Sequence, residues 1–175
     1  MRRIGGWIAP LIVSAALSVG VWAWLGWPVD MPPAPEPKLH CASYTPFRGD
    51  QTPFDPTLMI PKAQIAEDLK QLQPTTNCVR TYAVDQGLDQ VVPIAAGLGM
   101  QVLLGIWIGR DPAANERQIA LAVELAKAHP DTVKAIIVGN EVLLRGEQRG
   151  EALAEIAARV RRESGRPVTY ADFWE

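Results

Sequence analysis

Cysteine and histidine are scarce in this sequence. Two residues of each type occur among 175, namely Cys41, Cys78, His40 and His129. The cysteines form no C-x-x-C pair and the histidines lie far apart, so the ligand spacing typical of a zinc site is absent. We therefore expect no metal centre in this protein.

The sequence also lacks the patterns that bind phosphate groups. Residues 41–54 contain no Gly-rich fingerprint, which disfavours a dinucleotide or phosphate site and predicts no cofactor. Two of the 17 Lys and Arg are Arg2 and Arg3, so beyond residue 27 the remaining 15 stand against 19 Asp and Glu, a net charge of −4. The Lys and Arg residues form no cluster along the sequence. Because nucleic acid binds to clustered positive charge, we expect no nucleic-acid partner.

Charge is absent from residues 4–27, a run of 24 residues. A helix of that length, rising about 1.5 Å per residue, can cross a hydrocarbon core of about 30 Å. Arg2 and Arg3 precede the run, so the positive-inside rule keeps the N-terminus in the cytoplasm and sends the rest outward. A cleaved signal peptide is the alternative, but its apolar core spans roughly 7–15 residues and no A-x-A pattern follows here. We favour an uncleaved anchor at residues 1–27, with one pass through the inner membrane of a bacterium.

A proline-rich segment, residues 28–39, follows the anchor and predicts a stiff spacer before a folded domain at residues 40–175. An unstructured linker is the alternative. If the domain is exported to the periplasm, the compartment permits a disulfide between Cys41 and Cys78. Two small buried thiols at the starts of neighbouring strands are equally compatible with the sequence.

Short apolar runs alternate with helix-patterned segments from residue 40 onward. The predicted strands are residues 41–44, 78–82, 101–107, 133–139 and 167–170. Between them, apolar residues at helical spacing mark residues 65–72, 88–98, 119–126 and 153–160. The unit repeats about every 30 residues, which is typical of βα units with a parallel sheet.

Two α/β architectures fit this alternation, an open doubly wound sheet and a closed (β/α)8 TIM-type barrel. Polar and aromatic residues gather where the predicted strands end, which is the face that carries the sites of barrel enzymes. A barrel needs about 250 residues, whereas the predicted domain has enough for five strands and four helices. We therefore expect a truncated barrel, either a fragment or one completed by partner chains.

The sharpest chemical feature is the segment VGNEVLLR, residues 138–145. An apolar strand ends there in Gly139, Asn140 and Glu141. A carboxyl group at a strand tip can protonate a leaving oxygen when its surroundings favour the protonated form, and Asn140 could hydrogen-bond a sugar 2-hydroxyl. An exposed loop glutamate is the common alternative, but the position above a buried strand favours a catalytic role.

Five more residues lie at strand ends and are candidate sugar contacts. They are Tyr44, Arg80, Tyr82, Trp107 and Tyr170. The indole could stack on a pyranose face, or cap the core; the tyrosines could bind sugar hydroxyls, or anchor loops. An arginine inside a barrel needs a carboxylate partner or must reach the cleft.

Five segments together resemble the bacterial branch of glycoside hydrolase family 17, the β-1,3-glucanases. They are SYTPFRGDQTPF, NCVRTYAVDQGL, VLLGIWIGRD, VGNEVLLRGE and VTYADFWE. The resemblance covers nearly everything from residue 41 onward and implies a (β/α)8 barrel that acts on β-glucan by a retaining mechanism. It implies that Glu141 is the general acid/base. It matches Tyr44, Arg80, Tyr82, Trp107 and Asn140 to glucan-lining positions, and Tyr170 and Asp172 less closely.

The resemblance places the nucleophile, a second glutamate, at the end of the seventh strand, beyond residue 175. We expect these 175 residues alone to be inactive. Transglycosylation of β-glucan, or a part in β-1,6-glucan synthesis beside a membrane glycosyltransferase, is the alternative enzymatic role. A non-catalytic glucan-binding element is the third possibility.

Overall fold

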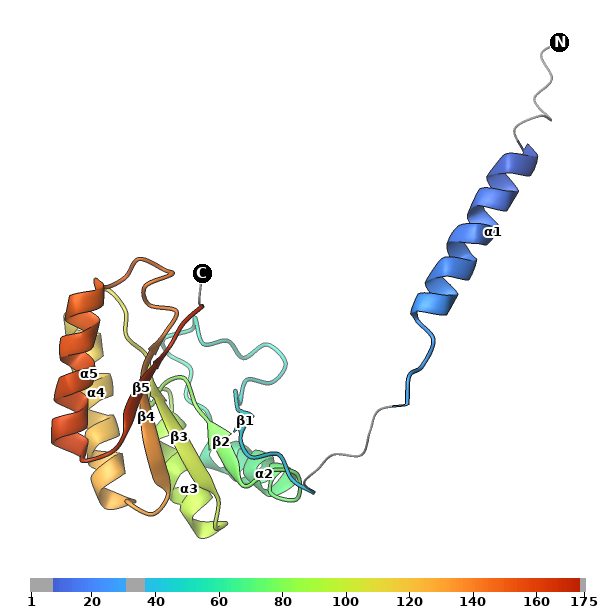
Figure 1. Ribbon diagram of the computed structural model, residues 1–175. Coiled ribbons are helices and arrows are strands. Elements are labelled where there is room, and N and C mark those ends of the chain that lie inside the picture. The colour runs from blue at the N-terminus through green and yellow to red at the C-terminus, as the bar shows by residue number, and fades with distance from the viewer. Residues whose placement is uncertain (1–7, 31–36, 174–175) are drawn as a thin grey trace. The chain divides into compact units, whose positions relative to one another are not determined.

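The computed structural model describes residues 8–30 and 37–173, which fall into two units divided near residue 35. Residues 1–7 and 31–36 lie outside the described part, and with them the charged N-terminus and much of the predicted spacer. The first unit contains helix α1 (Ile8–Leu25), with a mean hydropathy of 1.9 and no buried residue (Figure 1). Its length and composition suit a membrane span. Pro10 is tolerated because the first turn of a helix leaves its N–H groups without partners.

The second unit is a parallel sheet whose strands follow one another in chain order. They are β1 (Ala42–Ser43), β2 (Cys78–Arg80), β3 (Gln101–Ile106), β4 (Val133–Asn140) and β5 (Val168–Ala171). The order β1-β2-β3-β4-β5 has no reversal. A doubly wound sheet reverses its strand order at a switch point. The sequential order found here therefore indicates a barrel-type sheet and not a doubly wound one.

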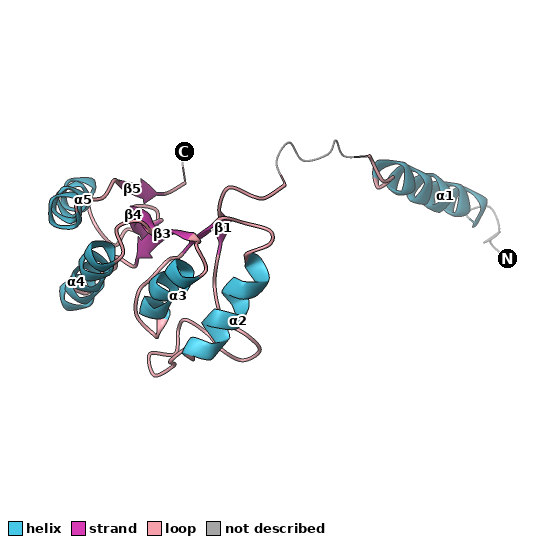
Figure 2. Ribbon diagram, turned by 90° about the horizontal axis from the view of Figure 1, so that it is seen from below, coloured by secondary structure: helices cyan, strands magenta, loops and turns pink. Residues whose placement is uncertain are grey.

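The helices of this unit all cover one face of the curved sheet (Figure 2). They are α2 (Lys62–Leu72), α3 (Val91–Gly97), α4 (Pro112–Ala128) and α5 (Gly150–Ser164), with a 3-10 turn, η2 (Leu88–Gln90), before α3. One-sided cover is the arrangement of a βα barrel, in which helices form the outer ring. The predicted five strands and four helices are confirmed.

The core lies between the sheet and its helices. Val102, Leu104 and Ile106 alternate along β3 and are fully or almost fully buried. Ile65 and Ile119 meet this layer from α2 and α4. The period of two on the strand and the apolar stripe on the helices explain why these segments take these structures.

Two of the differences from the predicted elements lie in the second βα unit. The segment predicted as one helix at residues 88–98 is divided, because Pro93 lacks the N–H that would bond the carbonyl of Asp89. A 3-10 bond from Gln90 N–H to Gly87 O closes the preceding turn at 3.2 Å. The strand predicted at residues 78–82 ends at Arg80.

Candidate active site

The carboxyl end of β4 turns sharply at Gly139, whose φ is +81°. A Cβ atom here would lie 2.4 Å from Cγ2 of Val142, so only glycine fits. The turn interrupts the strand alternation and leaves Asn140 facing β2. There the Asn140 Oδ1 accepts a hydrogen bond from Nη2 of Arg80 at 2.7 Å. An acceptor thus engaged leaves the amide Nδ2 to donate to a ligand.

Glu141 follows with a φ of +54°, which is uncommon for a residue with a side chain. Its N–H donates to Ala171 O of β5 at 2.8 Å, and its carbonyl accepts the N–H of Arg145 at 2.9 Å. The carboxylate is exposed and makes no hydrogen bond with the described residues. A left-handed backbone conformation at a non-glycine residue costs about 1–2 kcal/mol of stability. Such residues occur more often at functional sites than elsewhere.

Arg80 is partly buried at the end of β2. Its guanidinium lies 4.6 Å from the centroid of the Tyr82 ring, a cation–π distance. Its Nε is buried and has no hydrogen-bond partner among the described residues. The arginine therefore meets an amide and an aromatic ring, and its buried Nε–H is available to a further acceptor.

Trp107 follows β3 and lines two adjoining depressions at the carboxyl edge of the sheet, of 230 Å³ and 510 Å³. Tyr82 and Phe47 contribute to the smaller depression, and Phe54 and Met59 to the larger. Trp107 remains 43% exposed, so part of the indole is accessible to a ligand. An exposed aromatic beside an apolar hollow suits stacking on a sugar ring.

Tyr44 lines the smaller depression together with Tyr82 and Trp107, although only 6% of the residue is exposed. Its side chain is buried in the core, and its hydroxyl donates to Oδ2 of Asp68 on α2 at 2.8 Å. Burial, reinforced by that hydrogen bond, raises the pKa of Tyr44 far above the ordinary value. These contacts fit the anchoring role that the sequence left open for tyrosine.

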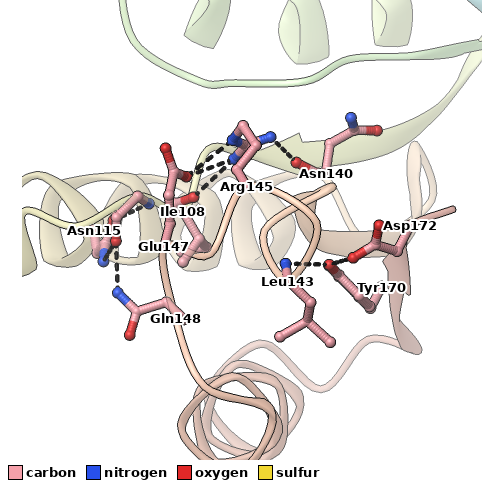
Figure 3. Close-up of polar contacts among 10 residues, drawn as sticks. Ile108, Asn115, Asn140, Leu143, Arg145, Glu147, Gln148, Tyr170 and Asp172 are labelled. Carbon is pink, nitrogen blue, oxygen red and sulfur yellow. Dashed lines mark hydrogen bonds and ion pairs between the residues drawn. The ribbon is translucent and has the colours of Figure 1, made fainter.

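Tyr170 on β5 also has an occupied hydroxyl. It donates to Oδ2 of Asp172 and accepts the N–H of Leu143 at 2.9 Å (Figure 3). Burial and the bond to Asp172 raise the pKa of Tyr170, and the same bond lowers the pKa of Asp172. This pair holds the loop that follows Glu141.

Arg145 ends the segment at residues 138–145, and the sequence gave it no role at the candidate site. Its guanidinium contacts the carbonyls of Asn140 and Ile108 and the carboxylate of Glu147, as Figure 3 shows. It also lies 4.3 Å from the centroid of the Trp107 ring. The sequence gave no signal for the contacts with Ile108 and Trp107, because they join the loop after β4 to the loop after β3, and Ile108 lies 37 residues from Arg145.

Nearly all of the second unit matches one protein family. Residues 41–175 match the BtgE/BtgC glycoside hydrolase domain. The chain belongs to this family. The resemblance to glycoside hydrolase family 17 is confirmed by this match and by a solved structure of that family.

Two curated relatives show how far the similarity extends along each chain. A glucan 1,3-β-glucosidase of Schizosaccharomyces pombe is 33% identical over 117 residues, which cover 61% of this chain and 36% of that protein. Glucan endo-1,3-β-glucosidase btgC of Emericella nidulans is 31% identical over 120 residues, which cover 65% of this chain and 18% of that protein. The chain thus spans a minor part of the length of these relatives.

Solved structures similar to this BtgE/BtgC domain show the same fold. A family 17 β-1,3-glucanosyltransferase from Rhizomucor miehei superposes with a TM-score of 0.63 at 27% identity, covering 76% of this chain and 49% of that one. An active-site mutant of that transferase was solved with laminaritriose and matches equally well. An endo-laminarinase from Formosa Hel1_33_131, at 23% identity and a TM-score of 0.59 over 70% of this chain and 37% of that one, shows the fold alone.

Proposed function

We propose that this protein is a retaining glycosidase of the BtgE/BtgC family that acts on β-1,3-glucan, with Glu141 as its general acid/base. The observation that carries the proposal is the end of β4. There an exposed carboxylate directly follows an asparagine whose amide is oriented by Arg80. The substrate is inferred from the relatives, which are named for 1,3-β-glucan, and from laminaritriose in the Rhizomucor miehei transferase.

In the proposed reaction the Glu141 carboxyl group protonates the glycosidic oxygen as the bond to the anomeric carbon breaks. A second carboxylate, about 5–5.5 Å from the first in retaining enzymes, attacks that carbon and forms a glycosyl-enzyme. Glu141, now a carboxylate, removes the proton from the incoming water or sugar hydroxyl, whose oxygen displaces the enzyme carboxylate.

The second carboxylate is the part of the mechanism that the resemblance places beyond residue 175. Arg80 supports this arrangement, because its unpaired Nε is a buried donor at the same edge of the sheet. A buried arginine N–H without an acceptor is costly, and a carboxylate is its natural partner. We propose that Arg80 holds the nucleophile through this nitrogen.

Sugar binding is proposed for Trp107, Tyr82 and Asn140. The first two line the depressions at the carboxyl edge, and Nδ2 of Asn140 is the donor left for a sugar 2-hydroxyl. Tyr44 and Tyr170 support the site indirectly, because both hydroxyls are engaged by carboxylates of this chain.

Transfer to a sugar acceptor is the second candidate reaction. The structural relative at 27% identity is named a glucanosyltransferase, and hydrolysis and transfer share the glycosyl-enzyme. The acceptor alone decides between them. A part in β-1,6-glucan synthesis beside a membrane glycosyltransferase would use the same intermediate.

We further propose that α1 anchors the domain to the outer face of a bacterial inner membrane. Supporting observations are the wholly exposed apolar helix and the disulfide between Cys41 and Cys78. Disulfides persist in oxidising compartments such as the periplasm.

The substitution Glu141→Gln tests the catalytic role in the full-length protein. Removing acid catalysis should lower turnover of laminarin by about 10²–10⁴-fold. An activated aryl β-glucoside should still form the glycosyl-enzyme, because its leaving group needs little protonation. Values of kcat/KM for both substrates, which report formation of the glycosyl-enzyme, check this expectation.

The matched control is Glu151→Gln, a substitution of the same chemistry at a side chain that is 83% exposed at the start of α5. It should leave both rates unchanged. Unchanged laminarin turnover by the Glu141 variant would contradict the catalytic assignment. Laminarin binding without turnover by the wild type would instead favour a non-catalytic glucan-binding role.

A further inference from the structure

Arg145 lies where three segments of the carboxyl edge meet. Nη1 donates to the carbonyl of Asn140 at the end of β4, and Nη2 donates to Ile108 O after β3 at 3.3 Å. Nε and Nη2 both donate to Oε2 of Glu147, at 3.0 and 2.7 Å. The side chains of Arg145 and Glu147 are only 25% and 21% exposed, so this ion pair is largely shielded from water.

The contacts use the whole planar guanidinium group. All three of its nitrogens donate, while the face of the plane stacks on Trp107 at 4.3 Å from the ring centroid. A lysine ammonium carries the same charge but is a point donor without a plane. Lysine at this position could keep the attraction to Glu147, but could not stack and reach both carbonyls at once.

These contacts hold the acid/base residue from two sides. The guanidinium binds the carbonyl of Asn140, which belongs to the peptide that joins Asn140 to Glu141. The backbone N–H of Arg145 binds the carbonyl of Glu141 itself at 2.9 Å. Because the Glu141 carboxylate has no hydrogen bond of its own with the described residues, its direction depends on the backbone that carries it.

We propose that Arg145 is a positioning residue, which sets the Glu141 carboxylate and the Trp107 indole in one fixed relation. The indole would hold the sugar, and the carboxylate must reach the oxygen of the bond to be cleaved. A misplacement of about 1 Å in such an arrangement can cost about 10²-fold in rate. This inference rests on the proposed function. It assigns to Arg145 the alignment of the Glu141 carboxylate with the indole that would hold the sugar.

The test is Arg145→Lys in the full-length protein, with kcat/KM measured for laminarin and for an activated aryl β-glucoside. Both values report the step that forms the glycosyl-enzyme, but only the natural glucan needs full protonation of its leaving group. The variant should lose roughly 10²-fold on laminarin and far less on the aryl substrate. A merely structural defect would lower both values by the same factor.

Arg159→Lys is the matched control, because Arg159 is also an ion-paired arginine, bonded to Glu116 and Glu163, but lies on α5. It should leave the ratio of the two kcat/KM values unchanged. An active wild type with equal losses on both substrates in the Arg145 variant would overturn the positioning role alone. A wild type that turns over neither substrate would overturn the proposed function.

Discussion

Gly139 and Glu141 both take left-handed backbone angles, and they do so for different reasons. Gly139 has no room for a side chain, because Val142 packs where its Cβ would be. Glu141 has an exposed side chain, and its backbone is held by Ala171 and Arg145. Together the two residues turn the chain from the buried strand to the face where a ligand can bind.

Gly139→Ala should destabilise the protein and disturb Glu141. The left-handed angle costs a non-glycine residue about 1–2 kcal/mol, and overpacking against Val142 about 1–3 kcal/mol more. We expect a loss of about 3 kcal/mol in the free energy of unfolding, measured by urea denaturation, together with reduced glucan turnover.

Gly146→Ala is the matched control for this loss. Its φ is +60°, but a Cβ there would meet no atom within 4 Å. It should cost only the backbone part, about 1 kcal/mol. Equal losses at the two positions would show that Val142 does not pack against Gly139 as described.

At the scale of elements, β1 is the weakest part of the sheet because it has only two residues. Its register with β2 pairs Ala42 with Val79 and Ser43 with Arg80. Cys41 and Cys78 occupy the next rung of the same register and are joined by a disulfide. The bridge thus holds a strand whose backbone pairing is too short to secure it.

Reduction of this disulfide should therefore loosen β1. A bridge that closes a loop of 37 residues is expected to stabilise the folded state by about 4 kcal/mol in the chain-entropy account. Urea denaturation of the wild type, with and without a thiol reductant, measures this difference. Cys41→Ser should show the same loss without reductant, and no further loss with it. Equal stability of oxidised and reduced wild type would contradict a stabilising bridge.

At the scale of the whole molecule, an apolar helix precedes a domain with its own core. Every described residue of α1 is exposed, so nothing within its own unit covers its apolar surface. A helix of this kind is stable in lipid, where its backbone bonds are satisfied internally. The core of the βα domain is formed within the second unit, and α1 belongs to the first.

Deletion of residues 1–27 should release the protein from the membrane, because it removes the apolar helix. The full-length protein should stay in the membrane pellet after alkaline carbonate extraction, and the truncated form should be soluble. Deletion of residues 28–39 is the control, since it removes the spacer and keeps the anchor. A mature protein whose mass lacks the N-terminal segment would show a cleaved signal peptide instead.

The elements were predictable because each carries a local pattern. Continuous apolar runs predicted β2 to β5 and the helical stripes predicted α2, α4 and α5, whereas the division before α3 and the end of β2 at Arg80 were missed. The motif at residues 138–145 predicted Glu141 and Asn140 as a pair. The catalytic and sugar-binding roles of these residues stay predictions, which the experiments above test.

The sequence by itself determined the apolar helix, the alternation of strands and helices, and the strand-end positions of the candidate residues. These depend on periodicity within ten or twenty residues, which a single chain displays directly. Only the tertiary structure decided the bridging of Cys41 and Cys78, the engagement of Tyr44 and Tyr170, and the contacts of Arg145 with Ile108 and Trp107. Each of these joins residues from different βα units or loops, and such contacts depend on packing in space that no local pattern records.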